Sequence, residues 1–293
     1  MTEPVRMLNI GIIGAGRAGR LLALALHRAG WPVTGIFSRT QESAGRLAGA
    51  MGAQTVDAIA GLPALCDLIL IAVPDDAIAS VSSALAQFGK LAGRIIVHTS
   101  GAHDSGALVA VAQAGARTGS LHPAFAISDE AYALAHVHEA TFAVESDDAS
   151  VRAVLFGLVH AMGATSVEIP PGMKAQYHAA TVIASNYLVT LYAASAGLLA
   201  ELGIDRKAAA GLLEPLMRAA LGNIAAQGVP AALTGPIARG DAGTVARHIA
   251  ALADRADTIL EMYQVMGRAT LPLAQARGLD AALIDALRTT LKG

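Results

Sequence analysis

Four polar side chains have the chemistry needed to move a proton or orient a substrate beside a reacting carbon. His122 stands before Pro123, and Lys174 and His178 lie four residues apart. Four residues make about one helical turn, so these two side chains share a face if the segment is helical. A His or Lys donor suits the reduction of a carbonyl or imine, in which a proton must arrive with the hydride. We therefore expect His122, Lys174, His178 and Asn186 to act in catalysis, unless His122 is a histidine that only bonds to the backbone.

A glycine-rich segment could hold the phosphates of a dinucleotide. It reads Gly14-Ala15-Gly16-Arg17-Ala18-Gly19, with the spacing GxGxxG, after an apolar run and before a helical pattern. Gly14 allows the tight turn, Gly16 lets a pyrophosphate approach the backbone, and Gly19 lets the helix pack on the strand. Free N–H groups at the start of the helix then bind phosphate oxygens. We expect all six residues to bind the cofactor, the alternative being a glycine-rich turn without a ligand.

The end of the second expected strand distinguishes between two nicotinamide cofactors. A carboxylate there binds the ribose hydroxyl of NAD, whereas an arginine accommodates the 2′-phosphate of NADP. The sequence reads Ser38-Arg39-Thr40, with no acidic residue before Glu42. We therefore expect Ser38, Arg39 and Thr40 to bind the phosphate of NADP(H). The alternative is that Arg39 is simply solvated at the end of a strand.

Residues that end the following strands should border the nicotinamide and the substrate. Val73 and Pro74 end one apolar run, and Ser100 and Gly101 follow another. Open parallel sheets hold their ligands at this carboxyl edge. We expect Val73, Pro74 and Ser100 to bind the cofactor, and Ser100 and Gly101 to bind the substrate. The next two residues, Asp75-Asp76, can serve instead as N-caps of the helix that follows.

A polar stripe runs along the helix that is predicted to start near Met173. The members within about 60° of Lys174, at 100° per residue, are Tyr177, His178, Thr181, Ser185 and Tyr192. On an otherwise apolar helix this stripe predicts the wall of a cleft, in which Tyr177 and Ser185 contact the substrate. Asn186 falls about 120° from Lys174 and reaches the cleft only across a kink. The alternative is an amphipathic helix whose polar side meets solvent or other helices.

A loop farther along the chain offers a ligand for a carboxylate. Gly235, Pro236 and Gly240 restrict its backbone, and Arg239 is a bidentate donor suited to a carboxylate group. We expect Arg239 to bind the substrate. An Arg239–Asp241 ion pair that merely pins the loop is an equal alternative.

The elements that must position these residues follow the pattern of an α/β protein. Apolar runs alternate with helical patterns up to about residue 125, as in the βαβ units of a parallel sheet. Strands are expected at 9–13, 33–37, 54–56, 68–73, 95–98, 118–121, 141–145 and 166–169. We predict an α/β Rossmann domain with a mostly parallel, doubly wound sheet over residues 1–170, then an all-α dimerisation domain over 171–293. Helix breaks are expected at Gly203, 228–230, 233–241 and 270–272.

Composition bears on partners and location. Hydrophobic residues make up 54% of the 293 residues and charged residues 15%, which predicts a subunit interface and a homodimer through the C-terminal helices. The net charge of −2, without a run of Lys or Arg, disfavours a nucleic-acid partner. Cys66 is the only cysteine and no signal-peptide pattern begins the sequence, so we expect a cytoplasmic protein.

The uncharged stretch 179–200 is long enough to span a membrane. It contains several polar residues and lacks flanking clusters of Lys or Arg, which a spanning helix would use for orientation. We therefore expect no membrane partner, and a helix that is buried inside the dimer.

Several of these motifs together resemble one protein family. They are the glycine loop, Ser120-Leu121-His122-Pro123, segments 177–180 and 184–187, and the loop 232–241. The chain is identified as a member of the Rossmann-like NADP oxidoreductases whose C-terminal helical domain has no known function. That family is similar to pyrroline-5-carboxylate reductase, 6-phosphogluconate and β-hydroxyacid dehydrogenases, and ketopantoate reductase. The resemblance implies NADP(H), a helical dimerisation domain, an active site between the domains and ketopantoate as a named substrate.

Two details of the resemblance concern the catalytic residues. β-Hydroxyacid dehydrogenases carry a Lys and an Asn four residues apart on the equivalent helix, whereas His178 follows Lys174 here. The Ser-Leu-His-Pro segment resembles the Gly-x-His-Pro segment of prephenate dehydrogenases, which implies a catalytic role for His122. We expect hydride transfer between NADP(H) and a small carboxylated carbonyl or imine compound, without a metal. The alternative is a non-catalytic NADP(H)-binding sensor or assembly protein.

Overall fold

The computed structural model of the chain describes residues 7–88, 91–253 and 258–292. They form two compact units, Met1–Asn186 and Tyr187–Gly293. The helix that follows Pro170-Pro171-Gly172 therefore belongs to the first unit. The domain boundary after residue 170 stays a prediction.

The first unit is built on an eight-stranded sheet in the order β3-β2-β1-β4-β5-β6-β7-β8. The strands are β1 (Ile10–Ile13), β2 (Val33–Phe37), β3 (Gln54–Thr55), β4 (Leu68–Ile71), β5 (Ile95–His98), β6 (Arg117–Ala124), β7 (Thr141–Glu145) and β8 (Thr165–Glu168). All neighbours pair in parallel except β6 and β7, which are antiparallel. This topology confirms the expected Rossmann sheet, and every expected strand is present.

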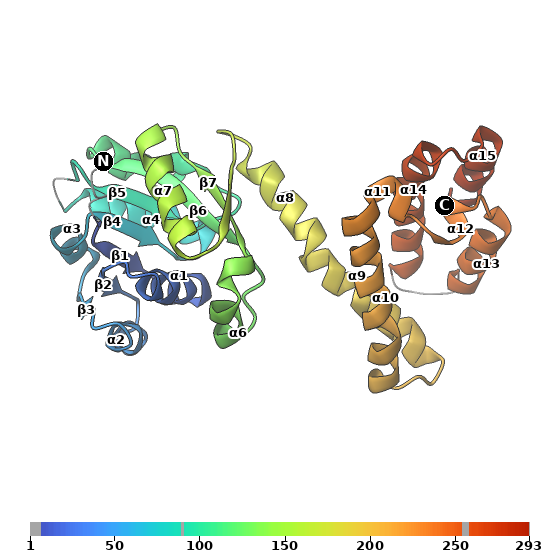
Figure 1. Cartoon of the computed structure of the whole chain (residues 1–293), viewed down its shortest axis with the longest axis horizontal. Coiled ribbons are helices and arrows are strands. Elements are labelled where there is room, and N and C mark those ends of the chain that lie inside the picture. The colour runs from blue at the N-terminus through green and yellow to red at the C-terminus, as the bar shows by residue number, and fades with distance from the viewer. Residues whose placement is uncertain (1–6, 89–90, 254–257, 293) are drawn as a thin grey trace. The chain divides into compact units, whose positions relative to one another are not determined.

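Helices cover the sheet of this unit (Figure 1). They are α1 (Arg17–Arg28), α2 (Gln41–Gly49), α3 (Leu62–Leu65), α4 (Asp75–Ala86), α5 (Val109–Gln113), α6 (Glu130–Ala135) and α7 (Ala149–Ala161), with short 3-10 turns at Ile59–Gly61, Ser105–Leu108 and Val137–Glu139. Helix α8 (Lys174–Ala184) follows β8 and does not cover the sheet. Alternate residues of the central strands enter two different cores, because Leu68 and Leu70 pack in one and Ile69 and Ile71 in the other. Burial on both faces explains why these strands are continuous apolar runs rather than alternating ones.

The second unit is helical in the residues that the structure describes. Its helices are α9 (Asn186–Glu201), α10 (Arg206–Gln227), α11 (Val229–Ala232), α12 (Gly235–Ala238), α13 (Ala242–Leu252), α14 (Ile259–Ala276) and α15 (Ala281–Thr290). The expected break at 270–272 is wrong, since α14 continues through Pro272. Proline costs one helical hydrogen bond there, but Leu271 and Ala274 hold the helix because both are buried in the core of this unit.

Ser185 lies between α8 and α9, with φ −113° and ψ −65°. By length and composition alone, Lys174–Glu201 could also cross a membrane. In the described part of the chain, no residue of α9 is buried. The apolar residues of this helix are thus left for a partner or a bound molecule to cover.

Candidate functional site

The loop between β1 and α1 has the backbone of a phosphate cradle. Gly14 has φ +102°, and a Cβ there would lie 2.3 Å from the carbonyl oxygen of Ala72. A Cβ on Gly19 would lie 2.0 Å from the carbonyl oxygen of Gly14. A Cβ on Gly16 would meet nothing within 4 Å. Two glycines therefore make the tight turn and close packing, and the third leaves open space above the loop for a ligand.

The start of α1 offers free donors to that space. Gly16 is the N-cap, and no side chain caps the helix. The first intrahelical bond joins the N–H of Arg20 to the carbonyl of Gly16, so the N–H groups of Arg17, Ala18 and Gly19 have no acceptor among the described residues. Such a helix start binds the oxygens of a pyrophosphate. The loop therefore fits a dinucleotide.

The residues expected at the ribose phosphate fall at the end of β2. Arg39 is exposed and has no ion pair or hydrogen bond within the described ranges. Thr40 is the N-cap of α2, where its Oγ1 accepts a bond from the N–H of Ser43 and donates one to its Oγ. Arg39 is thus a cation that no described residue neutralises, next to the start of α2. Such a guanidinium can bind the 2′-phosphate of NADP.

The carboxyl edge of the sheet carries a cavity of about 310 Å³ beside this loop. Its lining includes Ala18 of the loop together with Val73, Ser100, Gly101 and His122. The structure thus brings together residues that the sequence assigns to cofactor, substrate and catalysis. Pro74, the N-cap residue of α4, is absent from the lining, whereas Asp75 is part of it. The alternative N-cap role of Asp75-Asp76 is wrong, since both residues lie in the first turn of α4.

His122 contacts two polar side chains from α8, Tyr177 and His178. Its Nδ1 lies 2.9 Å from the hydroxyl oxygen of Tyr177, and its ring meets that of His178 edge to face with centroids 5.7 Å apart. Burial, assisted by the positive charge of Lys174, lowers the pKa of His122 to about 4. Burial raises the pKa of Tyr177 to about 12. Both groups are therefore neutral at physiological pH and share one hydrogen bond.

Gly101 allows the two histidines to approach the sheet edge. A Cβ at this position would lie 2.4 Å from Cδ2 of His178 and 2.8 Å from Nε2 of His122. Real Cβ contacts are longer than this, so any side chain would displace one ring or both. The role of Gly101 is to leave room for the catalytic candidates.

A second cavity of about 400 Å³ lies against His122 and α8. Besides His122, its lining includes His178, Thr181, Ser185 and Asn186. The first turns of α8 thus present the predicted polar face toward β6. Tyr192, the last member of the predicted stripe, belongs to the second unit and is not in this lining.

Lys174 differs from the other three catalytic candidates because it lines neither cavity, and Tyr177, which is expected to contact the substrate, is also absent from both linings. Lys174 is 1% exposed, and its Nζ has no hydrogen-bond partner among the residues that the structure describes. Burial lowers its pKa to about 8, although the carboxylates of Glu145, Asp75 and Asp104 act in the opposite direction. The ammonium lies 5.5 Å from the centre of the Tyr177 ring. Lys174 can therefore act on Tyr177 and His122 through its charge.

Sequence reasoning missed a buried network below the site. Glu145 accepts hydrogen bonds from the N–H and Oγ of Ser105 and from Oγ of Ser120. His98 accepts from the N–H of Ser100 and bonds to the carbonyl of Asp104. These bonds fix the loop that carries Ser100 and Gly101. The only sequence signal was polar residues inside apolar runs.

Arg239 belongs to the second unit and ends α12. The alternative Arg239–Asp241 ion pair is not found, because the carboxylate of Asp241 caps α13 by accepting from the N–H and Oγ1 of Thr244. Arg239 is exposed, with no ion pair to a described residue. Separately, no cluster of three His, Cys, Asp or Glu in the described part of the chain could hold a metal ion.

Comparison with known families accounts for both parts of the chain. Residues 2–123 match the Rossmann-like domain, and residues 140–270 match the Domain of unknown function (DUF2520). The chain is a Rossmann-like protein with a DUF2520 domain. No curated protein matches its sequence.

Solved structures resemble the whole chain. A candidate NADP oxidoreductase from Bacteroides fragilis is 23% identical, with a TM-score of 0.73 over 89% of this chain and 97% of that one. Protein TM1727 from Thermotoga maritima is 25% identical, with a TM-score of 0.72 over 92% and 99%. A reductive aminase from Aspergillus terreus, solved with NADPH and ethyl-5-oxohexanoate, is 19% identical, with a TM-score of 0.62 over 97% and 92%. The fold is thus that of NADP oxidoreductases and reductive aminases.

Proposed function

We propose that this protein is an NADP(H)-dependent oxidoreductase that transfers hydride between the nicotinamide and a small carbonyl or imine compound. The observation that carries the proposal is the His122–Tyr177 pair, hydrogen-bonded at 2.9 Å, with His122 on the wall of a cavity that also includes Ala18, Val73 and Ser100. A proton-transfer pair therefore stands beside the expected position of the cofactor.

The residues present fit NADP(H). The N–H groups at the start of α1 would hold the pyrophosphate, and Arg39 would hold the 2′-phosphate. When bound, the nicotinamide supplies or accepts the hydride. Val73, Ser100 and Gly101 would border the ring at the carboxyl edge of the sheet, where they line the cavity.

We propose Tyr177 as the proton donor because its hydroxyl bonds to His122, which lines both cavities, while Tyr177 itself is in neither lining. With the proton of His122 on Nδ1, the imidazole donates to the Tyr177 oxygen and leaves the phenolic hydrogen for a substrate oxygen or nitrogen. His122 itself holds few extra protons near neutral pH because its pKa is about 4. The Lys174 ammonium, 5.5 Å from the ring centre, stabilises negative charge that develops on Tyr177.

The substrate class follows from the cavities and the fold relatives. Two hollows of about 310 and 400 Å³ adjoin His122, which suits a small molecule. The Aspergillus terreus enzyme was solved with NADPH and a keto ester, which supports a ketone or the imine made from one. Binding of a carboxylate by Arg239, and hence a 2-oxo acid such as ketopantoate, is the more specific part of the proposal.

The test is NADPH oxidation by the purified chain with ketones, ketone–amine mixtures and 2-oxo acids, including ketopantoate. We expect turnover with at least one class and loss of turnover in His122→Asn and Tyr177→Phe. Tight NADPH binding without turnover across the panel would indicate the sensor or assembly role instead. Arg239→Ala should weaken the binding only of those substrates that carry a carboxylate.

We also propose a cytoplasmic homodimer that forms through the C-terminal helices. Val189 of α9 is 68% exposed and Leu216 of α10 is 63% exposed, and burial of such side chains in an interface is favourable. Cys66, the single cysteine, is buried and forms no disulfide, which agrees with the proposed cytoplasmic location. Sedimentation velocity should show a dimer in buffer that Val189→Glu weakens; a chain that needs detergent to stay dispersed would indicate a membrane partner.

A further inference from the structure

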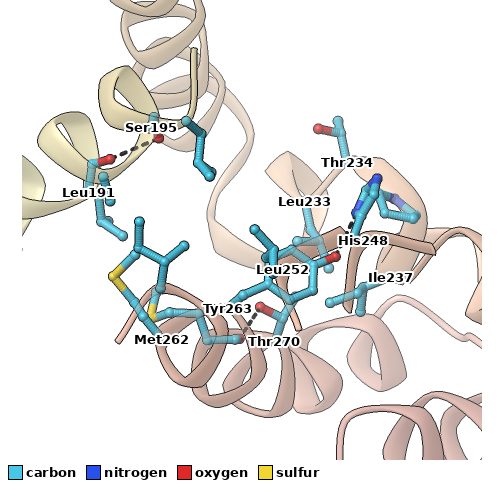
Figure 2. A pocket seen from close by; sticks show the side chains of 16 residues that line it. Leu191, Ser195, Leu233, Thr234, Ile237, His248, Leu252, Met262, Tyr263 and Thr270 are labelled. Atoms are coloured by element: carbon cyan, nitrogen blue, oxygen red, sulfur yellow. Dashed lines mark hydrogen bonds between the residues drawn. The ribbon is translucent and has the colours of Figure 1, made fainter. Parts of the chain in front are cut away.

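The second unit contains a cavity of its own, with a volume of about 430 Å³. It lies between α9, the turn before α12, α13 and α14, and Figure 2 shows side chains from these elements around it. The apolar wall includes Leu191, Leu198, Leu233, Ile237, Leu252 and Met262. This volume falls in the range of about 300–1,000 Å³ that is typical of small-molecule sites.

The wall that α9 contributes is distinct from the face that we propose for the dimer. Leu191, Ser195 and Leu198 line the cavity and are half-buried. Val189 and Ala193 are exposed and fall on the opposite side of the helix, about 160° from Leu191 at 100° per residue. A dimer that covers Val189 would leave the cavity open.

One polar pair interrupts the apolar lining. Nδ1 of His248 lies 2.8 Å from the hydroxyl oxygen of Tyr263, and the two rings meet edge to face. Either tautomer of His248 leaves the pair one free donor and one free acceptor. His248 is exposed and Tyr263 is half-buried, so the pair stands where the cavity meets solvent.

The other polar groups in the lining are largely satisfied inside their own helices. Ser195 donates to the carbonyl of Leu191, and Thr270 donates to that of Met266. The described lining residues include no Lys, Arg, Asp or Glu. A charged group would lose hydration in this cavity without gaining an ion-pair partner among the described lining residues, so we expect a neutral ligand.

From these observations we infer that the cavity is a binding site for a neutral, mainly apolar small molecule that carries one hydroxyl or carbonyl group. The apolar body lies against Leu198 and Ile237, and the polar group bonds to the His248–Tyr263 pair. The site is separate from the His122 cavities because all of its lining residues belong to the second unit.

Calorimetric titration of the full chain tests the site with 2-naphthol as the neutral probe and 2-naphthoate as its charged counterpart. We expect one 2-naphthol per chain and binding of 2-naphthoate at least about tenfold weaker, because its charge would be buried without a partner. Tyr263→Phe should weaken 2-naphthol roughly five- to tenfold, as loss of one hydrogen bond does. The matched control Tyr192→Phe, outside the cavity, should bind like the parent chain. Leu198→Trp, which fills the cavity, should abolish binding.

Several results would overturn this site. They are the absence of saturable 2-naphthol binding, tighter binding of 2-naphthoate, equal effects of Tyr263→Phe and Tyr192→Phe, or full binding by Leu198→Trp. If Leu198→Trp loses its helical circular dichroism, Ile237→Trp on the opposite wall replaces it. A dimer that dissociates as 2-naphthol binds would show instead that a second copy of the chain fills the cavity.

Discussion

The imidazole of His122, at the carboxyl edge of β6, shares a 2.9 Å hydrogen bond with the hydroxyl of Tyr177 on α8. The two residues are 55 positions apart in sequence, and the start of α8 brings Tyr177 to the edge of the sheet. In the mechanism that we propose, His122 holds the Tyr177 oxygen in place, and the phenolic hydrogen is the proton that reaches the substrate.

Removal of the Tyr177 hydroxyl should slow the chemical step. We expect Tyr177→Phe to lower kcat by about a hundredfold or more, the range for loss of a positioned proton donor, with little change in the Kd of NADPH. Stopped-flow NADPH oxidation and a separate cofactor titration measure the two quantities. Tyr132→Phe, on exposed α6 of the same unit, is the control and should be neutral. Equal rates for the two variants would remove Tyr177 from the mechanism.

A methyl group at Gly101 should disturb both histidines. The added Cβ would lie 2.4 Å from the ring of His178 and 2.8 Å from that of His122, so we expect Gly101→Ala to lower kcat/KM at least about tenfold and to destabilise the fold, as overpacking does. Gly157→Ala in α7 is the matched control, because nothing lies within 4 Å of its added Cβ. Thermal unfolding and steady-state rates compare the pair. A fully active Gly101→Ala enzyme would contradict the described packing.

The buried ammonium of Lys174 should cost stability. Its pKa is about 8 in the folded chain against 10.5 for a free lysine, so the unfolded chain holds more protons between these two values. The free energy of unfolding contributed by this group therefore rises with pH across that window, and the full cost is present below it. Lys174→Met should raise the free energy of unfolding by about 1–3 kcal/mol near pH 7, with the gain lost above about pH 10.5.

Urea unfolding at several pH values measures the effect of Lys174→Met, and Lys207→Met on exposed α10 is its control. The same Lys174 variant should turn over more slowly, since the charge near Tyr177 is lost. A variant that is less stable than the parent chain at neutral pH would show that the ammonium has a partner that stabilises it.

Arg39 should select the phosphorylated cofactor. Because it is exposed and unpaired among the described residues, Arg39→Ala should raise the Kd of NADPH roughly tenfold or more, the loss of a charge-assisted hydrogen bond, and leave that of NADH nearly unchanged. Arg46→Ala, which breaks an exposed pair with Glu42 on α2, should change neither Kd. A preference for NADH that survives Arg39→Ala would refute the NADP assignment.

The sequence predicts the sheet well because its signals are local. The apolar runs give every strand of the Rossmann sheet, and the spacing of Gly14, Gly16 and Gly19 gives the loop, since each glycine meets a steric requirement of its own turn. Pro272 shows the limit of such signals, because a buried Leu271 overrides the tendency of proline to end a helix.

The polar contacts of the site depend on tertiary packing and are less predictable. Helical phase places Tyr177 and His178 on one face, but it does not show that Tyr177 reaches His122 or that Lys174 is buried without a partner. The periodicity of the sequence also does not show that Glu145 accepts hydrogen bonds from Ser105 and Ser120 below the site. These relationships appear only when three strands and α8 are packed together.

Transfer of deuterium tests the central claim most directly. The purified chain is given NADPH deuterated at the reactive carbon of the nicotinamide, together with a ketone and an amine, and the product is analysed by mass spectrometry. The account predicts a product with one deuterium on the former carbonyl or imine carbon, formed by the parent chain and Tyr132→Phe but hardly by Tyr177→Phe. Tight binding of the cofactor without deuterium in any product across the ketone, imine and 2-oxo acid panel would contradict it.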